Sequence, residues 1–458
     1  MYQINFNHPI HIYFIGIGGI SMSGLAEVLL SKGFAVSGSD RQSSALTQSL
    51  SEKGAHIFYG QKYENISSDI DVVVYTSAIH PDNPELVAAG DLSIPTLTRA
   101  QLLGQMMKNY EVPIAISGTH GKTTTTSMVS EILLAADTDP TLSIGGILKT
   151  IGGNIRVGGG KHFVTEACEY TNSFLSFFPK ISIILNVEED HLDFFKDIHD
   201  IRNSFHEFSL LLPKDGALII NGAIPGIEQI TKDLTCSVIT YGDTSDYDYY
   251  PEEISYNETG CASFTACGPD GSKDKVTLGV PGEHNIYNAL SAIALSDLLC
   301  LHRETVKKAL SAFKGTDRRF EYKGEYNGIS IIDDYAHHPT EITATLKAAA
   351  NYPHQKLWCV FQPHTYTRTK AFLKDFAKSL SLADEVILAP IYAARETDTL
   401  GVSSETLQKE IEALGKTCYC LPTFEEIEKF ISSNCSAGDL LITMGAGDVV
   451  NIGENLLK

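Results

Sequence analysis

Residues 114–124 have the sequence IAISGTHGKTT, in which an apolar run leads into two glycines and then Lys-Thr-Thr. An apolar strand that enters a glycine-rich turn and continues as a helix is typical of phosphate-binding sites. The glycines let backbone N–H groups wrap around phosphate oxygens, Lys122 supplies a positive charge, and the Thr123 hydroxyl can bind Mg²⁺. Ile116 replaces the first glycine of the full GxxxxGK[ST] pattern, so this is the shorter GxxGKTT form. A glycine turn beside a surface lysine would not explain all these features together.

Strand-like and helical patterns alternate along most of the chain, which predicts βαβ units and mainly parallel sheets. The expected strands include residues 11–15, 71–75, 112–116, 181–185, 329–332, 357–361 and 385–388. Residues 244–280 are rich in Asp, Tyr, Gly and Ser and predict an antiparallel or irregular insert. Helical segments end near residues 108 and 314. We therefore expect three domains, consisting of residues 1–107, 108–316 and 317–458.

The composition restricts the class of protein. The chain has 458 residues and a formal net charge of −21, which argues against a nucleic-acid binder. It contains no apolar run of about 18 residues, so we expect no membrane insertion. We also expect no secretory signal, because no basic region followed by an apolar stretch precedes the first strand. Nine cysteines without a CxxC pair indicate reduced thiols in a cytoplasmic protein.

A second glycine cluster, IGIGGIS at residues 15–21, follows an apolar strand and opens a helix. This arrangement favours an anion at the helix N-terminus, and Asp40 follows where a dinucleotide site would place a ribose ligand. However, Ser21 occupies the position of the third glycine, and the domain is too short for a complete dinucleotide fold. Nucleotide binding and a plain tight turn remain open, and a nicotinamide cofactor is less favoured than either.

Two acidic segments follow the phosphate motif at the ends of expected strands, where open α/β sheets bind ligands. The first contains Glu166, and the second contains His191. Because a nucleotide triphosphate needs Mg²⁺ and Mg²⁺ prefers oxygen ligands, Glu166 is a candidate ligand. His191 is the second candidate, although histidine is an uncommon Mg²⁺ ligand. The other acids of the second segment are alternatively a charged helix start: Glu188, Glu189, Asp190 and Asp193.

The last part of the chain contains further polar clusters. Asn285 opens a helix and is either a reader of a base edge or the helix cap. Arg318 and Arg319 can clamp phosphate, although arginine pairs are usually solvated. Two expected parallel strands end in polar residues, so these lie at one edge of a sheet. The polar residues of these tips are Asp333, Asp334, Tyr335, His337, His338, Gln362, His364 and Arg368.

Taken together, these motifs resemble those of the Mur ligases, and the resemblance covers the whole chain. The most specific pieces are SGTHGKTTTT at residues 117–126, DDYAHHPTE at 333–341 and FQPHTYTRT at 361–369. The resemblance implies an α/β fold of three domains, each built on a mostly parallel sheet with flanking helices. These would be a Rossmann-like N-terminal domain for a UDP-sugar, a P-loop central ATPase domain and a Rossmann-like C-terminal domain for an amino acid. The implied reaction is ATP-dependent ligation of L-alanine to the carboxylate of UDP-N-acetylmuramate in peptidoglycan precursor synthesis.

The resemblance also implies roles for individual residues. Residues near the UDP-sugar would be Gly18, Gly19, Asp40 and Ser77. Residues that bind ATP would be Gly118, Thr119, His120, Gly121, Lys122, Thr123, Thr124, Asn285, Arg319 and Asp334. Mg²⁺ would be held by Thr123, Glu166 and His191, and the amino acid by Tyr335, His337 and Arg368. Lys122 would also be catalytic, and His337 is the candidate general base.

Three positions depart from the family pattern. Cys168 stands where many relatives have Asp, Ser21 replaces a common glycine, and Thr365 stands where some members carry a second arginine. Three alternatives also remain: a related ligase that attaches a preformed peptide to the same UDP-sugar, a dehydrogenase, and a non-catalytic nucleotide switch. The protein is expected to be a monomer or homodimer.

Overall fold

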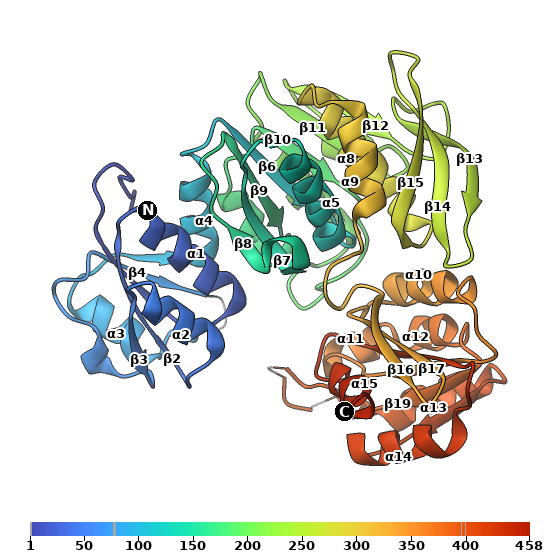
Figure 1. Ribbon diagram of the computed structural model, residues 1–458. Coiled ribbons are helices and arrows are strands. Elements are labelled where there is room, and N and C mark those ends of the chain that lie inside the picture. Colours follow the sequence, from blue (N-terminus) through green and yellow to red (C-terminus); the bar gives the residue numbers. More distant parts are fainter. Residues whose placement is uncertain (1, 77–78, 395, 399) are drawn as a thin grey trace. The chain divides into compact units, whose positions relative to one another are not determined.

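The computed structural model describes residues 2–76, 79–394, 396–398 and 400–458 (Figure 1). The chain divides into two compact units. The first contains Met1–Glu188, Ile198–Ile220 and Ile224–Ile239, and the second contains Glu189–Asp197, Asn221–Ala223 and Thr240–Lys458. The predicted alternation of strands and helices is confirmed. Over the residues described, no helix is both long and apolar enough to cross a membrane.

The N-terminal part of the first unit is a five-stranded parallel sheet in the order β3-β2-β1-β4-β5. Its strands are β1 (His11–Ile15), β2 (Ala35–Asp40), β3 (His56–Tyr59), β4 (Val72–Tyr75) and β5 (Thr96–Thr98). Its helices are α1 (Ile20–Ser31), α2 (Ala45–Glu52), η1 (Tyr63–Asn65), α3 (Pro84–Asp91) and α4 (Arg99–Met107). The first glycine cluster therefore lies between β1 and α1, as the sequence predicts.

A fully buried carboxylate, Glu85, joins α3 to this sheet. Its two oxygens accept hydrogen bonds from the Tyr13 hydroxyl at 2.7 Å, the Ser39 hydroxyl at 2.6 Å and the Asn65 amide at 2.7 Å. Burial and the Glu85 carboxylate together hold the pKa of Tyr13 well above its usual range, so the phenol remains a donor. These three donors offset the cost of burying the carboxylate.

We expect Glu85→Ala to lower the free energy of unfolding of the N-terminal part by about 2–4 kcal/mol, because three buried donors lose their acceptor. Thermal unfolding followed by circular dichroism should show an earlier transition. The fluorescence of Trp358, the only tryptophan and a residue of the second unit, should not show it. The exposed Glu64→Ala is the control. Coincident shifts of both signals, or no shift, would contradict this expectation.

The rest of the first unit is built on a seven-stranded sheet in the order β12-β11-β10-β6-β9-β7-β8. Strands β11, β10, β6, β9 and β7 are parallel, and β8 is antiparallel to β7. Its strands are β6 (Val112–Ser117), β7 (Thr141–Leu148), β8 (Gly153–Arg156), β9 (His162–Ala167), β10 (Ile181–Ile184), β11 (Ala217–Asn221) and β12 (Ser237–Tyr241). Its helices are α5 (Lys122–Ala135), η2 (Lys149–Ile151), η3 (Tyr170–Ser176), α6 (Ile198–Ser209) and α7 (Ile227–Thr231).

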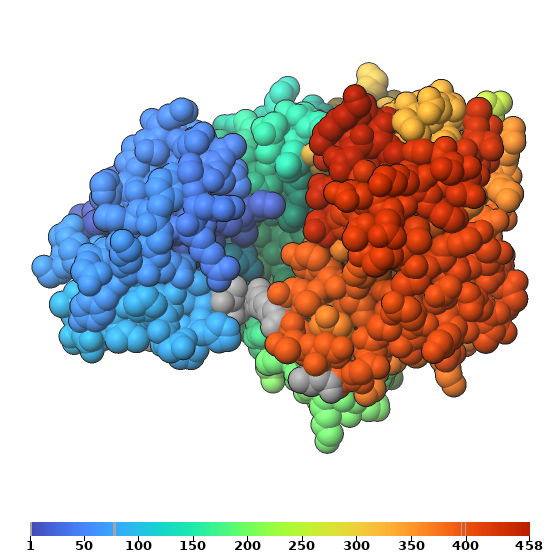
Figure 2. Space-filling model, turned by 90° about the horizontal axis from the view of Figure 1, so that it is seen from below, coloured from blue at the N-terminus to red at the C-terminus, as the bar shows by residue number. Residues whose placement is uncertain are grey.

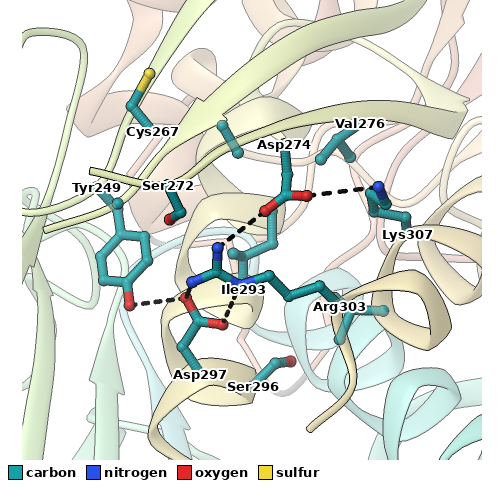
Figure 3. A pocket seen from close by; sticks show the side chains of 13 residues that line it. Tyr249, Cys267, Ser272, Asp274, Val276, Ile293, Ser296, Asp297, Arg303 and Lys307 are labelled. Carbon is teal, nitrogen blue, oxygen red and sulfur yellow. Dashed lines mark hydrogen bonds and ion pairs between the residues drawn. The ribbon is translucent and has the colours of Figure 1, made fainter. Parts of the chain in front are cut away.

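The second unit begins with the predicted antiparallel insert. It is a three-stranded sheet of β13 (Tyr250–Tyr256), β14 (Cys261–Cys267) and β15 (Lys273–Pro281), followed by α8 (His284–Leu298) and α9 (Arg303–Ala312). A small pocket between these elements is lined by Arg303, which bonds to Asp274 and Asp297 at 3.2–3.3 Å (Figure 3). Arg303 also bonds to Asp270 at 3.0 Å, and Lys307 pairs with Asp274. Each of the three carboxylates thus has a cationic partner, and the cluster links the hairpin to both helices.

The C-terminal part of the second unit is a six-stranded sheet in the order β16-β17-β21-β18-β19-β20, parallel except for β16. Its strands are β16 (Glu321–Tyr326), β17 (Ile329–Asp334), β18 (Leu357–Phe361), β19 (Glu385–Leu388), β20 (Thr417–Cys420) and β21 (Leu440–Met444). Its helices are α10 (Pro339–Ala350), α11 (Tyr366–Ala371), α12 (Leu373–Leu380), α13 (Ser404–Ala413), α14 (Phe424–Asn434) and α15 (Val450–Leu456).

Helices cover both faces of this C-terminal sheet. Apolar residues of α10, α12 and α13 form one buried cluster with the strands, and residues of α14 and α15 form another. The orange and red atoms of this part form a continuous surface in Figure 2. Strands β17 and β18 therefore end at the same edge of a rigid sheet. The polar residues that the sequence places after these two strands follow at that edge.

Candidate functional site

The phosphate loop, residues 117–121, connects β6 to α5. Gly118 has φ +140° and Gly121 has φ +83°, conformations that favour glycine. A Cβ atom on Gly118 would lie 3.0 Å from the Cβ of Leu185 and 3.1 Å from the backbone nitrogen of Asn186. Both glycines are thus required by the turn, which directs the chain into the N-terminus of α5.

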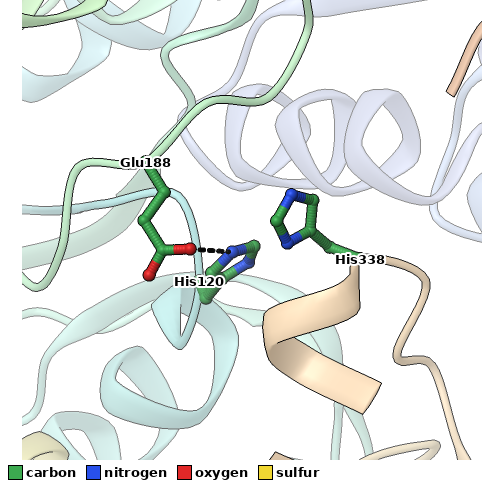
Figure 4. Close-up of side chains that lie close together, drawn as sticks. All are labelled: His120, Glu188 and His338. Carbon is green, nitrogen blue, oxygen red and sulfur yellow. Dashed lines mark ion pairs between the residues drawn. The ribbon is translucent and has the colours of Figure 1, made fainter. Parts of the chain in front are cut away.

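Asn186, after β10, fixes this loop from the neighbouring strand. The His120 backbone N–H donates to the Asn186 side-chain oxygen at 2.7 Å, and the Asn186 amide donates back to the His120 carbonyl at 3.0 Å. The Thr119 hydroxyl accepts a hydrogen bond from the Glu188 backbone N–H at 2.9 Å. The imidazole of His120 lies 3.5 Å from the Glu188 carboxylate (Figure 4). The loop is therefore held in shape by the protein itself.

Lys122 is the first residue of α5 and its side chain folds back over the loop. Its Nζ lies 3.1 Å from Glu169 Oε2 and donates to the carbonyls of Gly118 and Thr119. Burial alone would lower the pKa of Lys122, but the Glu169 carboxylate outweighs burial and raises that pKa. The ammonium is therefore charged, desolvated and aimed at the loop.

Thr123 and Glu166 come together beside the loop. The Thr123 hydroxyl donates to Glu166 Oε2 at 3.1 Å, and the Gly145 backbone N–H donates to Glu166 Oε1 at 2.5 Å. A Cβ atom on Gly145 would lie 2.6 Å from Glu166 Oε2, so a side chain at this position of β7 would displace the carboxylate. A hydroxyl and a carboxylate beside a charged lysine are the hard oxygen donors that suit Mg²⁺ next to phosphate. The two residues fit that ion.

The first glycine cluster is organised by Asp40 at the end of β2. Asp40 Oδ2 accepts a hydrogen bond from the Gly18 N–H at 2.8 Å, and a Cβ atom on Gly18 would lie 2.7 Å from the same oxygen. Ser21, in the first turn of α1, accepts a hydrogen bond at 3.0 Å from the guanidinium of Arg99. The serine that departs from the glycine pattern thus holds a cation beside the N-terminus of α1.

In the second unit, two acids at the end of β17 have different surroundings. Asp333 is fully buried and accepts hydrogen bonds from Arg318 at 3.0 Å and from Thr443 at 2.6 Å. Asp334 accepts backbone hydrogen bonds from Phe320 and Ala336 at 2.8 and 2.7 Å. Burial raises the pKa of Asp334 to about 6, although nearby groups lower it in part. Asp333 thus secures Arg318, and Asp334 shapes the chain around the strand tip.

Tyr335 lies against two arginines. The guanidinium carbon of Arg318 lies 4.9 Å from the Tyr335 ring centroid, and that of Arg319 lies 5.2 Å from it. Arg319 is 3.8 Å from Glu341 in the first turn of α10. Stacking on the aromatic ring orients both cations without neutralising them.

His337 and His364 are held neutral. His337 Nδ1 lies 3.0 Å from the Tyr335 carbonyl, which assigns the proton to Nδ1 and leaves a lone pair on Nε2. Burial lowers the pKa of His337 to about 4, and burial likewise lowers that of His364 to about 4. Above about pH 5, Nε2 of His337 can therefore accept a proton.

We expect the free energy of unfolding of the C-terminal part to decrease as the pH falls from 6.5 towards 4. In this window the unfolded chain protonates two histidines that stay neutral in the fold. Asp334 and Asp333, whose pKa values burial raises, bind a proton more tightly in the fold and oppose part of the loss. The net difference is at most about one proton, or roughly 1.4 kcal/mol per pH unit. Urea unfolding followed by Trp358 fluorescence measures it. A midpoint that stays constant or rises on acidification would refute the expectation.

Arg368, in α11, is paired with Asp190 in the segment Glu189–Asp197 of the same unit. The Nη2 and Nε atoms of Arg368 lie 2.9 and 3.3 Å from Asp190 Oδ1, and Nη1 lies 3.2 Å from His364 Nδ1. Burial would raise the pKa of Asp190, but the Arg368 charge and neighbouring groups outweigh it and hold that pKa well below its usual range. His338 Nε2 lies 3.2 Å from the Glu189 carbonyl, so this segment is fastened at two strand tips.

The three parts of the chain match three family descriptions. Residues 11–111 match the Mur ligase family, catalytic domain; residues 116–296 match the Mur ligase middle domain; and residues 318–447 match the Mur ligase, glutamate ligase domain. The chain is 61% identical to the UDP-N-acetylmuramate–L-alanine ligase of Lachnospira eligens and 60% identical to that of Agathobacter rectalis, covering 100% of each chain. It belongs to the Mur ligase family.

Solved Mur ligase structures have the same fold. UDP-N-acetylmuramate-alanine ligase MurC from Thermotoga maritima matches with a TM-score of 0.82 and 30% identity over 98% of both chains. A murein peptide ligase from Psychrobacter arcticus matches with a TM-score of 0.73 and 28% identity over 98% of both chains. The predicted three-domain α/β fold of a Mur ligase is thus confirmed, whereas the limits of the domains at residues 107 and 316 remain predictions.

Two interpretations of the sequence are wrong in this Mur ligase. Residues 188–193 do not begin a helix, because α6 starts at Ile198 and His191 has φ +53°, which a right-handed helix excludes. Asn285 does not cap α8; its amide donates to the Pro281 carbonyl at 2.7 Å, and its oxygen accepts from Asn288 at 3.0 Å. Ser77 lies outside the described residues. His191 lies in the second unit, whereas Thr123 and Glu166 lie in the first.

The sequence did not single out several residues that shape the site. Glu169 pairs with Lys122, Asn186 fixes the phosphate loop, Arg99 bonds to Ser21, and Asp190 holds Arg368. Glu169 lies within three residues of Glu166, but this position does not by itself identify it as the partner of Lys122. The others depend on contacts between distant segments.

Proposed function

We propose that this Mur ligase joins L-alanine to the carboxylate of UDP-N-acetylmuramate with hydrolysis of ATP, in the synthesis of the peptidoglycan precursor. The observation that carries the proposal is the placement of Lys122, Thr123 and Glu166 around a preformed phosphate loop. Full-length relatives of about 60% identity bear the name of this activity, which supports the same substrates here. The free cysteines agree with a cytoplasmic enzyme.

The phosphate loop and α5 would bind the ATP phosphates through residues Gly118, Thr119, His120, Gly121, Lys122, Thr123 and Thr124. Thr123, Glu166 and His191 would hold Mg²⁺, which neutralises phosphate charge when bound. Asn285, Arg319 and Asp334 are proposed to contact the nucleotide. Gly18, Gly19, Asp40 and Ser77 are proposed to contact the UDP-sugar, because the first glycine loop opens at the N-terminus of α1.

A carboxylate is a poor acyl donor, because its leaving group would be oxide. In the proposed reaction a carboxylate oxygen attacks the γ-phosphorus of ATP, the bond to the β–γ bridging oxygen breaks, and ADP leaves. Lys122 stabilises the charge on the transferred phosphoryl group. The alanine nitrogen then attacks the acyl carbon, the bond to phosphate breaks, and inorganic phosphate leaves.

The incoming amine must lose a proton as the amide forms. His337 is the proposed acceptor, because its Nε2 carries a lone pair at neutral pH. Arg368 would bind the alanine carboxylate, and Tyr335 would line the same tip. Thr365 occupies the position of a second arginine in some family members, so Arg368 would bind that carboxylate with less help.

The experiment that tests this function is phosphate release with ATP, Mg²⁺ and UDP-N-acetylmuramate, scanned over single amino acids and one tripeptide. We expect release with L-alanine and little with the tripeptide. A preference for the tripeptide would instead support the peptide ligase alternative, represented by the Psychrobacter arcticus structure at 28% identity. No release with any acceptor would refute both.

A further inference from the structure

One carboxylate oxygen, Asp190 Oδ1, is the centre of a buried junction in the second unit. It accepts hydrogen bonds from Arg368 Nη2 and Nε at 2.9 and 3.3 Å and from the His191 backbone N–H at 2.7 Å. The side chains of Asp190 and Arg368 are 8% and 11% exposed. Both charged groups of such a buried pair are largely removed from water. Their mutual hydrogen bonds therefore fix the position of both side chains.

The Asp190 contacts occupy only one edge of the guanidinium. Asp190 takes the edge formed by Nε and Nη2, whereas Nη1 faces His364 Nδ1 at 3.2 Å. A guanidinium has five N–H donors, and the second edge, between Nη1 and Nη2, keeps hydrogens that can bind a carboxylate in a fork. Asp190 therefore fixes the plane and rotation of Arg368 without closing its second edge.

The segment that carries Asp190 is itself anchored. His338 Nε2 lies 3.2 Å from the Glu189 carbonyl, and the same imidazole accepts from the Thr340 N–H at the start of α10. The carboxylate is thus set against the C-terminal sheet by two independent contacts on neighbouring residues. Such a support favours ligand binding, because the ordering of a flexible arginine side chain costs rotamer entropy and lowers the affinity.

We propose that Asp190 is a positioning residue that presents the second edge of Arg368 to the carboxylate of the incoming amino acid. The inference rests on the proposed function, in which Arg368 binds that carboxylate. It assigns to Asp190 a role in amino-acid affinity. Since every α-amino acid carries the same carboxylate, the effect is common to L-alanine, glycine and L-serine.

The test compares Asp190→Asn with Glu189→Gln, which removes an adjacent but exposed carboxylate. Phosphate release is measured against each substrate in turn. We expect Asp190→Asn to raise the KM for L-alanine about tenfold or more, because a charge-assisted contact is lost. The KM values for ATP and UDP-N-acetylmuramate should stay within about twofold, and Glu189→Gln should behave as the unmodified enzyme.

A double-mutant cycle separates positioning from general damage. Arg368→Lys should raise the KM for L-alanine by itself and add little to Asp190→Asn, because both changes break one arrangement. If Asp190→Asn does not fold, Asp190→Glu keeps the charge, displaces the oxygen and should still raise that KM. An unchanged KM for L-alanine would overturn the proposal, and a lower one would identify Asp190 as a competitor for Arg368. Absence of alanine-dependent release in the unmodified enzyme would instead refute the proposed function.

Discussion

Lys122→Ala is expected to lower alanine-dependent phosphate release by about a thousandfold or more. The ammonium is charged and desolvated over the phosphate loop. In the proposed reaction it would replace water as the partner of the transferred phosphoryl group. Removal of one preorganised donor from such a site costs about a hundredfold to a thousandfold, and Lys122 carries a full charge. The measurement is kcat for phosphate release at saturating substrates.

The variant also leaves Glu169 without its lysine, although the Glu169 side chain is only 4% exposed. A buried carboxylate that loses its cation is destabilised, so a damaged fold would also lower the activity. The double variant Lys122→Ala with Glu169→Gln removes both charges and is the matched control. We expect it to be as inactive as the single variant while its thermal unfolding stays near that of the unmodified protein. Near-normal release by either variant would refute the role of Lys122.

Glu166→Gln is expected to lower kcat by about a hundredfold and to raise the Mg²⁺ concentration needed for half-maximal activity about tenfold. The amide has nearly the size of the carboxylate and can still accept from Gly145, so the local packing survives. What is lost is the negative charge beside the Thr123 hydroxyl. The measurement is a Mg²⁺ titration of phosphate release at fixed ATP.

Glu131→Gln is the control for this Mg²⁺ titration, because Glu131 lies on the same helix, α5, and its carboxylate bonds to Thr150 outside the proposed site. We expect its Mg²⁺ dependence to equal that of the unmodified enzyme. An equal shift in both variants would mean that bulk charge, and not Glu166, sets the dependence. A Mg²⁺ requirement left unchanged by Glu166→Gln would remove that residue from the proposed metal site.

The phosphate loop could be predicted because its information is local. Gly118 and Gly121 are needed for positive φ, and Lys122 and Thr123 follow directly at the start of α5. The same holds for the strand tips at Asp334 and Arg368, since parallel strands bring their carboxyl ends to one edge. The alternation of strands and helices was therefore sufficient for the fold class and for the place of these strand tips, whereas the roles of the site residues remain predictions.

The partners of these residues could not be predicted in the same way. Asp190 and Arg368 are 178 residues apart in sequence, and Asn186 and His120 are 66 apart. Five acids lie between Glu166 and Asp190 in the two acidic segments, and nothing local distinguishes the one that pairs with Lys122. The mistaken helix at residues 188–193 has a different origin. Its charge pattern suits a helix N-terminus, but His191 has a left-handed backbone and its N–H bonds to the adjacent Asp190.

The segment Glu189–Asp197 belongs to the second unit although residues of the first unit follow it in the chain. No single proteolytic cut can therefore release the C-terminal half with its contacts complete. A fragment excised near residue 317 would carry Arg368 as a nearly buried cation without its carboxylate, and His338 without its backbone acceptor. We expect such a truncation to be recovered in poor yield, and supplying residues 189–197 through a fused linker would restore both partners.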